Sequence, residues 1–217
     1  MDNGKADERM NILAIETSLP KASLCLYSGG EIAFSTEWTA ERNHDAFLFP
    51  ALEEALTVLG GAPLDYILVG AGPGSYGGVR VALAAAIGIS TVRGGKSVSV
   101  CSWEGLAPQG CGIISDARRG GWTLYRPGQE IVVIPPAQLQ EELATGLVVY
   151  TIESEDCLQK VGLTAAGYDL VPTAQGLVRA WLSFTPAEQA ALAEKPAEPI
   201  YVRPPHITEA KRKPWEV

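Results

Sequence analysis

The sequence predicts an α/β fold with a mixed five-stranded sheet and helices in its first half, followed by a reduced second subdomain. Short apolar runs of strand length alternate with two longer segments of helical periodicity. Tight turns that contain Gly or Pro join the first three of these runs. Hydrophobic residues make up 47% of the 217 residues and charged residues 19%, so the chain can bury a sizeable core.

Three strands open the predicted sheet. Residues 11–17 form a short apolar run, and residues 22–27 and 31–38 follow as the second and third strands. The segments 18–21 and 28–30 between them are typical of tight turns. Consecutive strands joined by such turns pair antiparallel, so we expect a meander.

The first predicted helix covers residues 44–59 and ends at Gly60 and Gly61. Pro50 cannot donate a backbone hydrogen bond, so it bends this helix or marks its first turns. Apolar residues recur at helical spacing in two stripes, one of Leu48, Leu52, Ala55, Leu56 and Leu59 and one of Phe47, Ala51 and Val58.

A second helix and two more strands complete the first half. Residues 64–69 and 97–100 read as strands, and residues 79–92 between them as a helix. The order strand–strand–strand–helix–strand–helix–strand is the ribonuclease-H-like pattern of the actin-like ATPase superfamily. We therefore expect residues 11–103 to form one subdomain of this kind.

The second half is less regular. We expect residues 104–217 to form a reduced second subdomain with a C-terminal tail on the surface, and the polar residues 1–10 to form a flexible leader. The expected strands are 112–116, 122–126, 130–134 and 146–152, and the expected helices are 136–143, 155–161 and 174–184.

The charge balance argues against a protein that binds nucleic acid with its whole surface. Lys and Arg total 17 and Asp and Glu total 25, which gives a net charge of -8, whereas phosphate binding needs clustered Lys and Arg. The tail carries a small basic cluster, which we expect to be solvated, with contact to RNA or to an acidic partner as the alternative. Its residues are Arg203, Lys211, Arg212 and Lys213.

Cysteine and histidine usage predicts no metal site. None of the four cysteines sits in a CxxC pair, and two histidines are too few to complete a zinc spacing. We expect reduced, mostly buried thiols in a cytoplasmic protein. No apolar run approaches the ~20 residues of a membrane span, and the first ten residues lack the apolar core of a secretion signal.

The glycine-rich loop at residues 71–80 is the main candidate for ligand binding. It holds four glycines in ten residues between a strand and a helix, where backbone N–H groups can meet an anion. It matches neither the P-loop nor the dinucleotide fingerprint. A tight turn packed against a neighbouring chain explains the glycines equally well. The candidate phosphate or nucleotide residues are Gly72, Gly74, Ser75, Gly77, Gly78 and Arg80.

Two polar residues at element ends also need an interpretation. Glu16 closes the first strand, where nucleotide-binding members of the superfamily carry an acidic residue, but an ordinary turn residue is the favoured reading. His44 stands at a helix start, where capping and surface hydrogen bonding are favoured. No GxSxG elbow or metal cluster marks a peptidase, so we expect none.

The second helix carries more apolar surface than one sheet can cover. Arg80 is its only charged residue over almost three turns, and a helix that is apolar all round is buried all round. The surplus face then belongs to a helix-bundle interface with a partner, or else the second half folds over it. If this face binds a partner, we expect Leu83→Glu to break the association and to leave the protomer folded.

Several segments, in order from Ile12 to about Pro205, resemble the TsaB (YeaZ) family. They are ILAIETS, RNHDAFLFPALEEAL, GPGSYGGVRVALAAAIGIS, DARRG and PIYVRPP. The resemblance implies an actin-like ATPase fold in a degenerate paralogue of TsaD. TsaD transfers a threonylcarbamoyl group to the adenosine beside the anticodon of tRNAs that read codons beginning with A.

The resemblance also implies a non-catalytic scaffold subunit. It would bind a TsaD-type catalytic subunit, with a TsaE-type ATPase joining the assembly, and would meet tRNA only through the complex. Alone it would form a homodimer through the same surface. It would have no cofactor of its own, although the junction between the subunits would have room for ATP or ADP. The alternative is an ATP-binding kinase or ATPase of the superfamily. Assigned by helix, the implied interface comprises Phe47, Leu48, Ala51, Leu52, Ala55, Val79, Leu83, Ala86 and Ile87.

Overall fold

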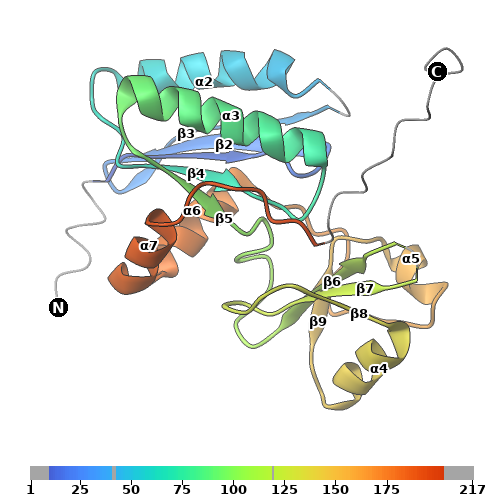
Figure 1. Ribbon diagram of the computed structural model, residues 1–217. Coiled ribbons are helices and arrows are strands. Elements are labelled where there is room, and N and C mark those ends of the chain that lie inside the picture. Colours follow the sequence, from blue (N-terminus) through green and yellow to red (C-terminus); the bar gives the residue numbers. More distant parts are fainter. Residues whose placement is uncertain (1–9, 41–42, 119, 203–217) are drawn as a thin grey trace, which may run out of the picture.

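The computed structural model describes residues 10–40, 43–118 and 120–202 and contains two β-sheets (Figure 1). The first sheet has five strands in the order β3-β2-β1-β4-β5, and the second has four in the order β8-β7-β6-β9. The strands of the first sheet are β1 (Ile12–Glu16), β2 (Lys21–Ser28), β3 (Glu31–Thr39), β4 (Tyr66–Gly70) and β5 (Lys96–Val100).

The first sheet is mixed, as the sequence predicts. β1 pairs antiparallel with β2, and β2 with β3, because tight turns join them. β4 pairs parallel with β1 and with β5, because a helix supplies each crossover. This arrangement confirms the predicted ribonuclease-H-like, actin-like ATPase fold class.

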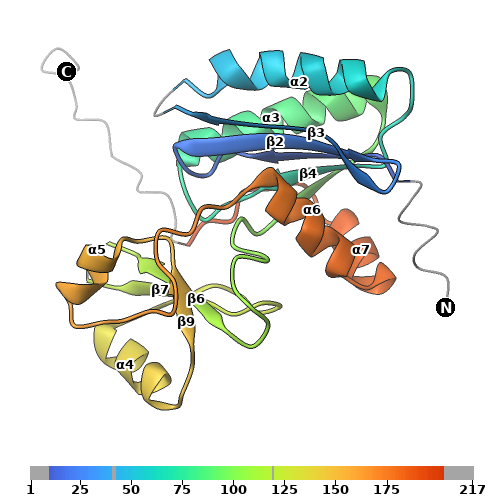
Figure 2. The same cartoon turned by 180° about the vertical axis from the view of Figure 1, so that it is seen from behind.

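Helices cover both faces of the first sheet (Figures 1 and 2). α2 (Asp45–Leu59) and α3 (Tyr76–Arg93) lie side by side on one face and bury leucine, valine and alanine side chains against it. α6 (Ala174–Ser183) packs on the opposite face, where Trp181 lies 4.7 Å from Tyr66 between ring centroids. The core of this half therefore has two layers, one on each side of the sheet.

The start of α3 differs from the expected residue 79. The helix begins at Tyr76, because the Ser75 side chain caps it by accepting a hydrogen bond from the Gly78 N–H at 3.3 Å. α2 begins at Asp45 and contains Pro50 in its second turn. Both helices end at glycines, Gly60 and Gly94, as the sequence pattern indicates.

The second sheet is small and carries its own core, with Ile114, Leu124 and Leu158 fully or almost fully buried. Its outer strands β8 and β9 and helix α5 are shorter than expected. The elements are β6 (Gly112–Asp116), β7 (Trp122–Tyr125), β8 (Val132–Ile134), α4 (Pro136–Ala144), β9 (Val149–Thr151) and α5 (Glu155–Gln159).

The chain returns from the second sheet to the first. The Ala174 N–H donates to Ser23 Oγ at 2.8 Å, and the Ile200 N–H donates to the Ala71 carbonyl oxygen at 2.7 Å. The helix α7 (Pro186–Ala193) was not predicted. The division of the chain into two subdomains at residue 103 stays a prediction. α6 and α7 come after this residue, yet they contact the first sheet.

The expected leader, apart from Met10, and the basic tail from Arg203 onward lie outside the described residues. Within the described ranges, no helix combines the length and the apolar character that crossing a membrane requires. The same part of the chain holds no group of three or more His, Cys, Asp or Glu residues suited to a metal ion.

Candidate functional site

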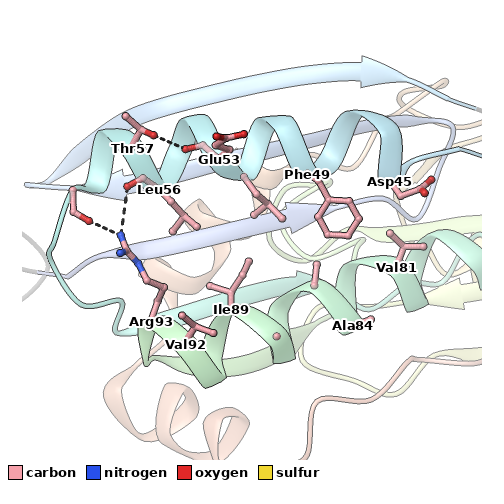
Figure 3. Close-up of a pocket in the computed structure, with 14 residues that line it drawn as sticks. Asp45, Phe49, Glu53, Leu56, Thr57, Val81, Ala84, Ile89, Val92 and Arg93 are labelled. Carbon is pink, nitrogen blue, oxygen red and sulfur yellow. Dashed lines mark hydrogen bonds between the residues drawn. The ribbon is translucent and has the colours of Figure 1, made fainter.

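An apolar groove of about 1110 Å³ runs between α2 and α3 on the side away from the sheet (Figure 3). Phe49 and Leu56 border it from α2, and Val81, Ile89 and Val92 border it from α3. Val92 is 80% exposed and Phe49 57% exposed, which is unusual for side chains of this size. We call this feature the α2–α3 groove.

The groove exists because the residues between its walls are small. Ala84, Ala85 and Gly88 lie on α3, where larger side chains would fill the space. Gly88 and Ala84 are exposed, and a Cβ added at Gly88 would meet nothing within 4 Å. Glycine in a helix interior costs roughly 1 kcal/mol relative to alanine. Nothing within the described part of the chain requires glycine at this position.

Polar groups lie at the ends and rim of the groove. Asp45 and Glu53 contribute carboxylates from α2. The Arg93 guanidinium closes the other end, where Nη2 donates to the carbonyl oxygens of Leu56, at 3.5 Å, and Gly60 (Figure 3). These carbonyls lie at the end of α2, so a cation there also opposes the negative end of the helix dipole.

Most residues of the expected interface lie in the core of the protomer. Phe47, at 48% exposed, and Ile87, at 54% exposed, are the two that solvent reaches freely. The others are buried within one hydrophobic cluster of the protomer, and of these Leu52 also lines the α2–α3 groove. They are Leu48, Ala51, Leu52, Ala55, Val79, Leu83 and Ala86.

The residues that line the α2–α3 groove include ones on helix faces that the predicted interface does not contain. On α3, the exposed small residues Ala84 and Gly88 lie four positions apart, with Val81 and Val92 in the same row. On α2, Phe49 belongs to neither of the two predicted stripes. As far as the structure describes it, to residue 202, the second half of the chain does not fold over these residues, because Ala84, Gly88 and Val92 are exposed.

The glycine-rich loop packs tightly against the first hairpin of the same chain. A Cβ at Gly74 would lie 2.3 Å from the Ser18 carbonyl oxygen, and one at Gly78 would lie 2.0 Å from that of Thr17. The Ser75 N–H donates to the Ser18 carbonyl oxygen at 2.7 Å. Close backbone approach therefore accounts for two of the glycines without a ligand.

The other loop residues have different surroundings. Gly72 adopts a φ of 94°, which favours glycine, and its N–H donates to Ser102 Oγ at 3.0 Å. A Cβ at Gly77 would meet nothing within 4 Å. Arg80 Nη1 donates to the Tyr76 hydroxyl at 2.6 Å, and its guanidinium lies 4.9 Å from the centre of that ring. Phosphate binding by this loop stays a prediction.

Glu16 is buried rather than a simple turn carboxylate. It is 1% exposed, and its Oε1 accepts a hydrogen bond from the Ser18 N–H at 2.7 Å. Burial raises the pKa of this carboxyl above its ordinary value, while hydrogen bonds from Ser18 oppose the shift. Gly70 lies so close that a Cβ there would overlap the Glu16 carboxylate, 1.8 Å from Oε2.

His44 occupies the N-cap position of α2, as its place at the helix start predicts, but its side chain does not cap the helix. Its side chain makes no capping hydrogen bond, is 5% exposed, and has no hydrogen-bond partner for Nδ1 among the described residues. Burial lowers its pKa. The four cysteines are free, but only Cys25 is buried, and the other three are half-buried.

Part of the chain is similar in sequence to a known family and to curated proteins. The family model for TsaD, tRNA N6-adenosine threonylcarbamoyltransferase, matches residues 38–130. The tRNA threonylcarbamoyladenosine biosynthesis protein TsaB of Bacillus subtilis is 33% identical over 138 residues, which cover 58% of this chain and 60% of that protein. An uncharacterised protein of Mycobacterium tuberculosis is 30% identical over 129 residues, 54% of this chain and 60% of that protein. These curated relatives are thus matched over 60% of their length.

Solved structures share the fold over most of the chain. YeaZ from Pseudomonas aeruginosa superposes with a TM-score of 0.66 at 22% identity and covers 88% of this chain and 99% of its own. Another Pseudomonas aeruginosa protein, described as similar to peptidase YEAZ, gives 0.67 at 23% identity, with 89% and 100% covered. At these identities the superpositions show a common fold.

Proposed function

From the TsaB (YeaZ) assignment that these matches support, we propose that the chain serves tRNA threonylcarbamoyladenosine biosynthesis as an accessory subunit. Its task is to bind a TsaD-type enzyme through the α2–α3 groove and to support that enzyme as a non-catalytic scaffold. The observation that carries this proposal is an exposed apolar groove whose small-residue floor has no explanation within the described chain.

The groove suits a partner helix. Ala84, Ala85 and Gly88 let a second backbone approach α3 closely, while Phe49 and Val92 offer apolar area on either side. Small residues at a helix contact shorten the distance between helix axes, and large apolar neighbours supply the buried area. Asp45 and Glu53 on the rim favour a basic residue on the partner.

The same groove would bind a second copy of the chain when the enzyme is absent. A homodimer and a heterodimer then compete for one surface. In this proposal the protein works in the cytoplasm, a TsaE-type ATPase joins the assembly, tRNA is met through the complex, and any ATP or ADP lies at the subunit junction. The kinase or ATPase alternative gains no support from the loop, because Gly74 and Gly78 are explained by the hairpin they contact.

The experiment is light scattering on the purified chain, alone and mixed with the TsaD-type subunit of the same organism. Ala84→Glu places a carboxylate on the groove floor, and Thr91→Glu places one elsewhere on the exposed surface of α3. We expect Ala84→Glu to abolish both the homodimer and the heterodimer, and Thr91→Glu to leave them intact. If Ala84→Glu assembles like the unaltered chain, the groove is not the interface.

A further inference from the structure

Two tyrosine rings from distant parts of the chain stack on the surface at the start of α3. Tyr76 is the first residue of that helix, and Tyr201 lies near the end of the described chain. Their ring centroids are 5.6 Å apart, with 25° between the ring planes. Tyr76 is 52% exposed and Tyr201 is 45% exposed. Each ring therefore keeps open surface, although the other ring covers part of it.

Arg80, one turn further along α3, lies against the same pair. Its Nη1 donates to the Tyr76 hydroxyl at 2.6 Å, and its guanidinium carbon lies 4.9 Å from the centre of the Tyr76 ring. Among the described residues, no carboxylate forms an ion pair with this exposed guanidinium. Arg80 is thus held in place without being neutralised, which leaves its charge available to an anion. We call Tyr76, Arg80 and Tyr201 the Tyr–Arg platform.

The C-terminal segment is fixed to the first sheet by contacts other than this stack. Ser99 Oγ donates to the Glu198 carbonyl oxygen at 2.8 Å, and the Ile200 N–H donates to the Ala71 carbonyl oxygen at 2.7 Å. Both bonds lie before Tyr201 in the chain, and neither involves its side chain. Attachment of the segment therefore does not explain a large, half-exposed aromatic ring at this position.

A flat aromatic surface beside a free guanidinium suits an unpaired nucleobase and its phosphate. Proteins bind single-stranded nucleic acid by stacking bases on aromatic rings and on Arg planes, while cations contact the backbone. A protein partner is better served by anchors in a pocket that excludes water, whereas these rings are half exposed. The sequence after the platform is also basic, because residues 203–217 hold four Lys or Arg and two Glu. Those residues lie outside the described ones and are not part of the platform.

We propose that the Tyr–Arg platform stacks an unpaired RNA base and that Arg80 contacts a phosphate beside it. The choice of RNA over DNA rests on the proposed function in tRNA modification. None of the three residues lines the α2–α3 groove, so this surface is distinct from the one that docks the partner subunit. The chain would thereby contribute a contact of its own to tRNA held by the complex.

Fluorescence anisotropy at low ionic strength tests this on the full chain. The two probes are a labelled single-stranded RNA of about eight nucleotides and its duplex with the complementary strand. We expect the single strand to bind more tightly, because the bases of a duplex are stacked on one another and cannot reach the rings. Binding of the duplex at least as tightly as the single strand would overturn the proposal, and so would the absence of saturable binding by the single strand.

Two substitutions at Tyr201 test the stacking. Tyr201→Leu should raise the Kd for the single strand about tenfold, because it removes a stacking surface. Tyr201→Phe keeps the ring and should bind like the unaltered chain. Far-ultraviolet circular dichroism checks that both variants are folded. If Tyr201→Leu keeps the affinity, or if Tyr201→Phe loses as much as Tyr201→Leu, no base stacks on this ring.

The phosphate contact is tested by the salt dependence of binding. Arg80→Gln should lower the slope of log Kd against log salt concentration by about 0.7, the value for one contact to a single strand. Lys96→Gln is the matched control, because it removes the same charge from an exposed position on β5. An equal change of slope in the two variants would mean that Arg80 acts only through the net charge.

Light scattering with the TsaD-type subunit keeps this proposal separate from the docking proposal. Ala84→Glu, which tests the groove, should leave the RNA affinity of the isolated chain unchanged. Tyr201→Leu should leave the heterodimer intact. If Tyr201→Leu instead weakens the heterodimer and leaves the RNA affinity unchanged, the platform is a protein contact and the RNA proposal fails.

Discussion

The guanidinium of Arg93, the last residue of α3, donates a hydrogen bond to the carbonyl oxygen of Gly60, just beyond the end of α2. This bond joins the two helices at one end of the α2–α3 groove. The acceptor would otherwise be one of the carbonyls left unpaired at a helix C-terminus.

Arg93→Met should therefore lower the free energy of unfolding by about 1–2 kcal/mol, since it removes a hydrogen bond from a charged donor and a favourable dipole contact. Urea denaturation of the isolated chain measures this. Arg80→Met is the matched control on the same helix, because Arg80 is exposed and bonds only to Tyr76 among the contacts described. A loss no larger for Arg93→Met than for Arg80→Met would mean that the Arg93–Gly60 bond does not hold the helices.

Two glycines of α3 should respond in opposite directions to alanine. Gly88→Ala should stabilise the isolated chain by up to about 1 kcal/mol, because its Cβ meets nothing and alanine is the better helix former. Gly78→Ala should destabilise it by several times that amount, roughly 3 kcal/mol, because its Cβ would overlap the Thr17 carbonyl oxygen. Thermal unfolding by circular dichroism, at a concentration where light scattering shows a monomer, distinguishes them, and a destabilising Gly88→Ala in the monomer would contradict the open position of Gly88.

Leu83→Glu should unfold the protomer, which corrects the expectation that it only breaks association. Leu83 is 6% exposed and lies in the hydrophobic cluster beneath α2 and α3. A carboxylate there has no partner, and the loss should exceed about 3 kcal/mol. Ala84→Glu, one residue further on, should keep the far-ultraviolet circular dichroism of the native chain. A folded, monomeric Leu83→Glu would show that this helix face is accessible after all.

Stability should depend on pH through Glu16. Its pKa is raised in the folded state by burial, so folding favours the protonated form. The stabilisation is fully present below the ordinary carboxyl pKa of 4.5 and is lost as the pH rises through the folded value. Glu16→Gln imitates the neutral carboxyl, so it should be more stable than the unaltered chain at pH 8, with the difference closing towards pH 4. A difference that does not change between these pH values would contradict this assignment.

Local patterns in the sequence determined the elements of the first sheet. Apolar runs separated by tight turns predicted β1 to β3, and helical periodicity predicted α2 and α3 within a few residues. The helix α7 also had a local signal, the capping box formed by Thr185 and Glu188, which sequence reasoning did not use. These signals work because turn and cap preferences depend on neighbouring residues alone.

Only the tertiary structure decided which helix faces remain free. α2 and α3 are apolar on more than one side, so their periodicity could not tell whether Leu83 or Ala84 faces the sheet. Sequence periodicity also could not predict the burial of His44 and Glu16 or the return of α6 to the first sheet. The physical reason is that burial depends on contacts between segments distant in the chain. For that reason the sequence predicted a surplus apolar face on these helices, whereas the packing of α2 and α3 on the sheet determined that Phe49, Ala84 and Gly88 form it.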